Sequence, residues 1–137
     1  MKNMIPRDTG GDGTPDPWVY TYFPTNPADG AAELDPDGDS LNNVGEYIAG
    51  THPMDDSSVF KVPEVREQAG GIILSWAVQP ERQYRVVSIR DLVMGLSTMT
   101  CETDWMDPPV PMTLMTWTNA SPSATHDVYA IDVRIRP

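Results

Sequence analysis

The sequence predicts a mainly β protein, in which a small antiparallel β-sandwich follows an acidic loop segment with two short helices. Three observations support this fold class. After residue 58, apolar and polar residues alternate in several short runs, which is the pattern of half-buried strands. The chain holds 14 Pro and 10 Gly residues, which favour short elements over a helical bundle. Before residue 58, Asp and Gly residues cluster at regular spacing, as they do in turns.

Charge divides the chain at the same place. The 137 residues carry a formal net charge of -11. Residues 1–58 hold 11 acidic and 2 basic side chains, whereas residues 59–137 hold 9 and 7. We therefore expect two domains with these boundaries. The acidic balance argues against nucleic acid as a partner, because surfaces that bind nucleic acid are basic.

The stretch DPDGDSLNNVGE, residues 35–46, has the spacing of a twelve-residue cation-binding loop. Calcium takes about six to eight oxygen ligands at about 2.3–2.6 Å, and such a loop supplies them from positions 1, 3, 5, 7, 9 and 12. A solvated acidic turn is the alternative, but carboxylates this close repel one another unless a cation lies between them. The expected ligands, with the amide at position 9 acting directly or through water, are Asp35, Asp37, Asp39, the Leu41 carbonyl, Asn43 and Glu46.

A short helix is expected directly after this loop. Leu41, Val44 and Ile48 share one helical face, Gly50 is a plausible stop, and Pro53 follows. The whole run DPDGDSLNNVGEYIAGTHP resembles the thrombospondin type 3-like calcium repeats of secreted bacterial proteins, whose pattern is close to D-x-D-G-D-G-L-x-N-x-x-E-Y-x-x-G-T-x-P. Dockerin domains share the same loop logic. The resemblance implies an EF-hand-like calcium site.

Two positions of this copy depart from the family pattern. The family prefers Gly at loop position 6, where this chain has Ser40, and Asp is frequent where this chain has His52. Position 6 makes a sharp turn that needs φ > 0, which Gly adopts without strain. We therefore expect Ser40 to strain the loop or to weaken the ion without abolishing binding.

Residues 8–19 resemble a first, degenerate copy of the repeat. Gly10 replaces the carboxylate at position 3 and Val19 replaces the one at position 12. Two interpretations remain open: a weak, water-rich ion site, or a loop kept for its shape. Matching Thr-x-Pro triplets follow the two copies 26 residues apart, which supports an internal repeat. The remaining candidate ligands are Asp8, Asp12, the Thr14 carbonyl and Asp16.

Aromatic residues follow the first loop. Trp18, Tyr22 and Phe23 form an apolar stripe on an expected helix of one to two turns. We expect this stripe to pack against the helix of the second repeat. A ligand-binding role for these rings is the less economical interpretation, because large aromatic side chains dominate small cores.

The second domain is expected to hold short strands at residues 72–78, 84–89, 112–118 and 129–136, with another beginning at Phe60 and interrupted by Pro63. Such strands, separated by loops rich in Pro and Gly, favour an immunoglobulin- or fibronectin-like sandwich. The order of an L-x-W, a Y-x-V and a terminal R-I strand is similar to a small C-terminal β-domain that follows calcium repeats in secreted bacterial proteins. The resemblance implies the C-terminal part of a larger exported protein.

Catalytic motifs are missing from the sequence, which contains neither a G-x-S-x-G run, nor a phosphate-binding glycine loop, nor a paired His cluster. We therefore expect no enzyme activity. No stretch approaches the roughly 18 apolar residues of a membrane span. The N-terminal residues lack the apolar segment of a secretory signal, so an extracellular or cell-surface location implies an export signal elsewhere.

The expected function is a non-catalytic, calcium-stabilised structural or interaction module outside the cell, with a protein or glycan partner. Two alternatives remain. The sandwich could bind carbohydrate through Trp76, Trp105 or Trp117, whose flat faces suit sugar rings. The chain could instead self-associate into a surface layer or filament through an open sheet edge or the Met-rich residues 94–115.

Overall fold

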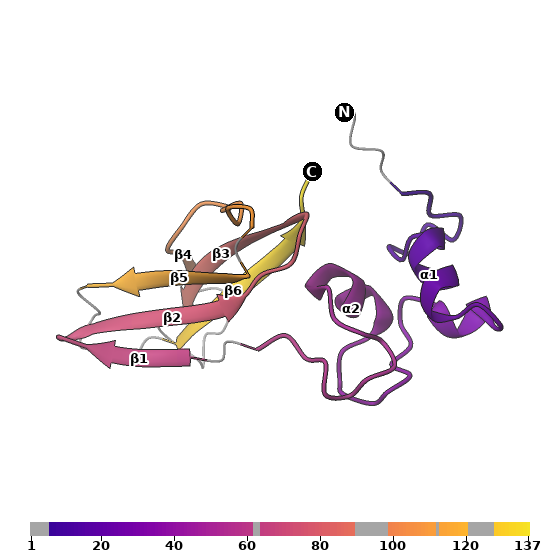
Figure 1. The fold of residues 1–137 in the computed structure, drawn as a ribbon, viewed down its shortest axis with the longest axis horizontal. Helices are drawn as coiled ribbons and strands as arrows, with labels where there is room; N and C mark the ends of the chain where they lie inside the picture. The colour runs from indigo at the N-terminus through magenta and orange to yellow at the C-terminus, as the bar shows by residue number, and fades with distance from the viewer. Residues whose placement is uncertain (1–5, 62–63, 90–98, 112, 121–127) are drawn as a thin grey trace. The chain divides into compact units, whose positions relative to one another are not determined.

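A computed structural model describes residues 6–61, 64–89, 99–111, 113–120 and 128–137. The chain divides into two compact units, Met1–Phe60 and Lys61–Pro137; Figure 1 shows the first in indigo to purple and the second in pink to yellow. The predicted fold class is confirmed, since the chain has two three-stranded antiparallel sheets and two short α-helices. Within the described residues, no helix is long and apolar enough to cross a membrane.

The first unit consists of loops joined by three short helices. These helices are α1 (Asp16–Tyr22), η1 (Pro27–Gly30) and α2 (Asn43–Ala49). The start of α2 is capped by Asn42, whose side-chain oxygen accepts a hydrogen bond from the Gly45 N–H at 3.0 Å. The helix ends at Gly50, which adopts the left-handed φ of 77° that suits a C-cap glycine. The helix stop predicted from Gly50 is confirmed.

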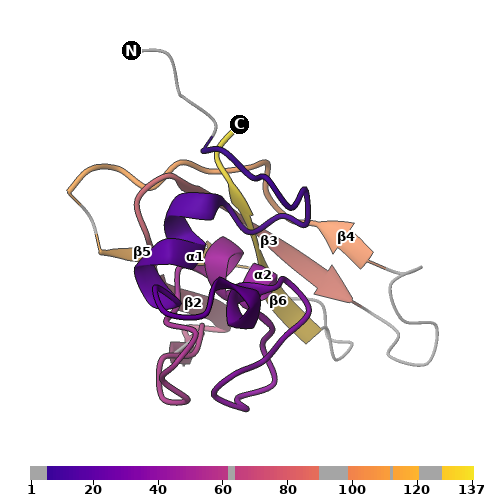
Figure 2. The same cartoon turned by 90° about the vertical axis from the view of Figure 1, so that its right-hand side faces the viewer.

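Aromatic rings join the two helical turns of this unit. The Trp18 ring of α1 lies 6.0 Å from the Tyr47 ring of α2 in an edge-on arrangement, and Figures 1 and 2 both show the two helices as neighbours. Tyr22 packs edge-on against His52 at 4.8 Å. Phe23 is buried. The predicted packing of the aromatic stripe against the helix of residues 43–49 is therefore confirmed for Trp18, whereas Tyr22 packs on His52, beyond the end of that helix.

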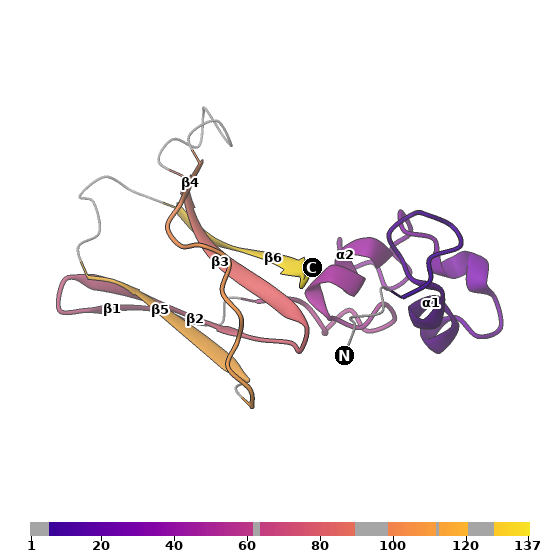
Figure 3. The ribbon, with the colours of Figure 1, turned by 90° about the horizontal axis from the view of Figure 1, so that it is seen from above.

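The second unit is a sandwich of two sheets, which Figure 3 shows as two layers. One sheet has the strand order β1-β2-β5 and the other has the order β4-β3-β6. Every pairing between neighbouring strands is antiparallel. The strands are β1 (Glu64–Gln68), β2 (Gly71–Ala77), β3 (Arg82–Ile89), β4 (Met99–Cys101), β5 (Leu114–Asn119) and β6 (Val128–Ile135).

Buried residues of the central strands β2 and β3 form the core of the sandwich. Trp76 of β2 and Tyr84 of β3 are fully buried, and their ring centroids lie 6.3 Å apart across the two sheets. Trp117 of β5 stacks with Tyr129 of β6 at 5.6 Å. The Tyr84 hydroxyl accepts a hydrogen bond from the Gln79 N–H at 2.8 Å, and burial raises its pKa. Trp76 is thus a core residue and offers no face to a sugar ring.

Two strands differ from the sequence expectation. The strand expected at Phe60 is wrong in position, because Phe60 is irregular and β1 begins after Pro63, at residue 64. Proline lacks the N–H that a ladder needs, so pairing starts beyond it. The short β4 was not expected, and it pairs with β3 opposite residues 87–89. Residues 94–98 and 112 of the Met-rich segment 94–115 lie outside the described residues.

Candidate metal centre

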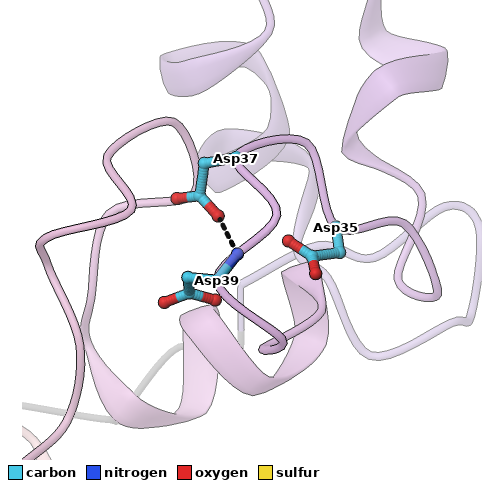
Figure 4. Close-up of side chains that lie close together, drawn as sticks. All are labelled: Asp35, Asp37 and Asp39. Carbon is cyan, nitrogen blue, oxygen red and sulfur yellow. Dashed lines mark hydrogen bonds between the residues drawn. The ribbon is translucent and has the colours of Figure 1, made fainter.

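The second loop brings three carboxylates together. One oxygen from each of Asp35, Asp37 and Asp39 lies within 4.8 Å of the other two, and Figure 4 shows the three side chains around one turn. Backbone hydrogen bonds fix this turn. The Asp35 carboxylate accepts the N–H groups of Gly38 at 2.8 Å and Ser40 at 3.1 Å. Asp37 accepts the Asp39 N–H at 3.2 Å, the dashed line in Figure 4.

These contacts leave one side of the loop's carboxylates without donors. The Asp39 Oδ1 accepts the Leu41 N–H at 2.7 Å. In contrast, the Oδ2 atoms of Asp37 and Asp39 are buried and have no hydrogen-bond partner among the described residues. Buried polar atoms in native proteins are nearly always paired. The two orphaned oxygens therefore point to a ligand that supplies positive charge.

Glu46 adds a fourth carboxylate from the first turn of α2. Its side chain is 1 % exposed, and neither of its two oxygens has a hydrogen-bond partner among the described residues. Burying an unpaired carboxylate is costly, since the charged form loses its water. A divalent cation between Glu46 and the loop would remove that cost, and this carboxylate stands at loop position 12, where calcium loops use both oxygens.

The pKa of Glu46 is raised, first by burial and then by the negative charges of Asp39 and Asp37. The Thr51 hydroxyl and His52 act in the opposite direction. The Thr51 oxygen nevertheless lies outside hydrogen-bonding geometry, because Thr51 and Glu46 both lack a partner. The charges of Asp37 and Asp39 therefore disfavour the ionised form of Glu46.

The other residues of interest in this loop are Ser40, Leu41 and Asn43. Ser40 adopts φ of 83°, so the left-handed turn expected at loop position 6 is present. The Leu41 side chain packs on Gly45, where an added Cβ would stand 2.5 Å from Leu41 Cδ1. Asn43 is fully buried, and its Oδ1 has no hydrogen-bond partner among the described residues. This orphaned amide oxygen fits the direct or water-mediated role expected at position 9.

The first loop has the same backbone turn, but the hydrogen bonds to its carboxylates differ. Asp8 accepts the N–H groups of Gly11 at 2.6 Å and Gly13 at 2.9 Å, matching Asp35 in the second loop. Asp12 accepts both the N–H and the hydroxyl of Thr14. Its other oxygen accepts the Ala32 N–H at 3.1 Å. These hydrogen bonds, with the Thr14 hydroxyl contributing most, lower the pKa of Asp12.

The other acidic residue of the first loop is also committed to protein donors. Asp16 accepts the N–H and hydroxyl of Thr9, which lower its pKa, and Arg7 lies 3.7 Å away. A hollow of about 220 Å³ lies between this loop and the η1 segment. Loop positions 3, 5, 7, 9 and 12 line one part of it, and Tyr20, Pro27, Gly30 and Ala31 line the rest. The lining residues from the loop are Gly10, Asp12, Thr14, Asp16 and Val19.

The second unit offers a different surface around Trp105. This half-buried ring lies beneath two guanidinium groups, those of Arg85 at 4.5 Å and Arg134 at 4.2 Å. Arg85 also pairs with Asp132 at 2.7 Å, and Arg134 donates to the Gln83 side chain. The surroundings of Trp105 therefore do not favour sugar binding, because the neighbours of this ring are arginines rather than a second aromatic ring.

The candidate metal centre is inferred from the geometry of the loop and not from similarity to known proteins. Comparison of the chain with models of protein families, with curated proteins and with solved structures finds no match. The donor set is made entirely of oxygen atoms, from carboxylates, an amide and the loop backbone. Such a set suits calcium or magnesium better than zinc or copper, which prefer imidazole or thiolate.

Proposed function

We propose that the first unit binds one calcium ion in the loop of residues 35–46, and that the chain is a non-catalytic, calcium-stabilised structural or interaction module. The observation that carries this proposal is the buried carboxylate of Glu46, neither oxygen of which has a hydrogen-bond partner in the part of the chain that the structure describes. A solvated acidic turn would leave these oxygens in water. Burial of four orphaned carboxylate oxygens in two aspartates and one glutamate supports a cation instead.

The function follows from linkage between binding and folding. The loop carboxylates and Glu46 converge only when α2 is formed, so calcium binds the folded unit and not the unfolded chain. Binding then stabilises the fold by RT ln(1 + [Ca]/Kd). At a calcium concentration of 100 Kd this amounts to about 2.7 kcal/mol. A loop with a strained turn at Ser40 fits the weaker, extracellular class of calcium sites, with Kd of about 10⁻⁴–10⁻³ M.

We place this module outside the cell, where millimolar calcium would saturate such a weak site, and we expect its partner to be a protein or a glycan. The described part of the chain contains one cysteine, Cys101, which is exposed and free. Without disulfides, a small extracellular unit gains stability from metal. Calcium would therefore keep the first unit rigid in this compartment.

Replacement of Glu46 by Gln tests the proposal because it keeps the shape of the side chain and removes the charge. With calcium near 100 Kd, we expect Glu46→Gln to lose most of the stabilisation of about 2.7 kcal/mol. In chelator the sign reverses, and the variant is at least as stable as the wild type because no buried charge remains unpaired. Scanning calorimetry in calcium and in chelator measures both effects.

A matched control is available in the same unit. Glu33 is exposed and lies outside the loop, so Glu33→Gln makes the same chemical change without touching the site. We expect this control to follow the wild type under both conditions. If Glu46→Gln keeps the full calcium stabilisation, or if calcium does not stabilise the wild type, the proposed function is wrong.

A further inference from the structure

Asn43 makes a contact that its place in the calcium loop does not require. Its side-chain nitrogen donates two hydrogen bonds of 2.9 Å, one to the carbonyl of Asp29 and one to the carbonyl of Ala31. Both carbonyls belong to the segment around η1, which follows the first repeat. The amide is fully buried, so these bonds exclude water and cannot be replaced by it without opening the structure.

The same side chain presents its oxygen in another direction. Asn43 Oδ1 is buried and has no hydrogen-bond partner among the described residues. Asn43 and Glu46 stand three residues apart on α2, which places them on one face of this helix. This face therefore presents two buried side chains whose oxygen atoms have no hydrogen-bond partner among the described residues.

Further hydrogen bonds continue from α2 into the first loop. The Asn43 N–H donates to the Leu34 carbonyl at 2.8 Å, and the Val44 N–H donates to the Ala32 carbonyl at 3.1 Å. The N–H of Ala32 in turn donates to Asp12 of the first loop. The Asn43 side chain also binds the carbonyl of the Ala31–Ala32 peptide group, whose N–H donates to Asp12, so this one peptide group links Asn43 of the second loop to the first loop.

We propose that Asn43 couples the calcium loop to the first repeat, so that calcium bound at the second loop also stabilises the η1 segment and the first loop. This inference rests on the proposed function and goes beyond it. The side-chain nitrogen holds the first repeat while the side-chain oxygen faces the ion or its water. The first loop, whose carboxylates are satisfied by protein donors, then gains order from an ion that it does not hold.

The test measures hydrogen exchange of backbone amides by NMR on the full chain, in calcium and in chelator. In the wild type we expect calcium to slow exchange at Ala31 and Ala32 by about tenfold, within the range typical of coupled sites. Asn43→Asp keeps an oxygen ligand at loop position 9 and removes both donors. We expect this variant still to bind calcium, as a parallel calorimetric titration would show, but to lose the slowing at Ala32.

Asn42→Asp is the matched control, since it makes the same chemical change one residue away. Asn42 is exposed and caps α2 with its side-chain oxygen, a role that Asp fills equally well. We expect this control to retain the slowing. If Asn43→Asp binds calcium and keeps the slowing at Ala32, the coupling through Asn43 is refuted while the calcium site stands. If the wild type binds no calcium, both proposals fail.

The wild-type chain supplies an arm that survives any failure of the variant to fold. The side-chain amide protons of Asn43 are themselves the proposed link, and their exchange can be followed directly. We expect calcium to slow their exchange together with that of the Ala32 N–H. Exchange of the Asn43 side chain that does not respond to bound calcium would overturn the coupling.

Discussion

The two loops of the first unit share a turn and differ in what fills it. In both, the aspartate at position 1 binds the N–H groups of positions 4 and 6, and the aspartate at position 5 binds the N–H of position 7. The second oxygen at position 5 marks the difference. In the first loop, Asp12 Oδ2 accepts the Ala32 N–H, whereas in the second loop Asp39 Oδ2 is buried and has no partner among the described residues.

The same backbone turn can therefore belong to a loop that needs a bound ion or to one that does not. The first loop has no carboxylate at positions 3 and 12, and the Thr14 hydroxyl donates to Asp12. In the second loop, Asp37 Oδ2 and both oxygens of Glu46 have no hydrogen-bond donor among the described residues. We therefore expect the first loop to be stable without an ion and the second loop to depend on one. Three sets of variants test this difference between the loops.

Of the next three changes, the largest effect is expected from Thr14→Val, which removes the hydroxyl that donates to Asp12. Thr14 is 3 % exposed, and a buried hydrogen bond to a charged group contributes about 1.5–3 kcal/mol. We expect a loss of about 1.5 kcal/mol in the free energy of unfolding, equal in calcium and in chelator. Denaturant unfolding under both conditions measures it. A loss confined to chelator would mean that the first loop also holds an ion.

Adding carboxylates to the first loop tests whether it can be made to bind calcium. Gly10→Asp together with Val19→Glu restores carboxylates at positions 3 and 12, and both positions line the hollow of about 220 Å³. An added Cβ at Gly10 meets ordinary contacts of 3.6 Å or more. We expect a second calcium site, worth about 1.4 kcal/mol at ten times its Kd. The neutral pair Gly10→Asn with Val19→Gln should create no site in the same calorimetric titration.

A smaller effect is expected at Ser40, which holds a left-handed φ of 83° in the second loop. The first loop has Gly13 at this position, with φ of 97°. Left-handed backbone costs a non-glycine residue about 1–2 kcal/mol, so Ser40→Gly should stabilise the unit by about 1 kcal/mol. Ser40→Ala keeps the Cβ and should gain nothing. Equal stability of these two variants would show that the turn is not strained.

Much of the fold could be predicted from alternation in the sequence. The apolar run of β2 and the regular alternation of β6 identify strands because one face of each lies on a core. β1 has the sequence EVREQ, whose charges suit an edge strand and conceal it from hydrophobic patterning. β4 has only three residues. The strand order β4-β3-β6 depends on contacts between distant segments, which one sequence does not reveal.

The candidate site could also be predicted only in part from the sequence. Fixed spacing places Asp35, Asp37 and Asp39 around one turn, and the structure confirms that their oxygens lie close together. The burial of Glu46 follows from helix packing and could not be predicted from spacing. The bonds from Asn43 to carbonyls 12 and 14 residues earlier also carry no local signal. The nearest hint of this contact is that Asn43 and Glu46 stand three residues apart, and thus on one face of α2.

The most direct test of the central claim is a calorimetric titration of the full, chelator-treated chain with calcium. One ion per chain is expected, bound by the second loop alone. The same titration of Glu46→Gln should show that site lost or greatly weakened, and Asp12→Asn should leave its stoichiometry unchanged. Absence of binding, two ions per chain, or a site indifferent to Glu46→Gln would contradict the contrast between an ion-dependent and an ion-independent loop.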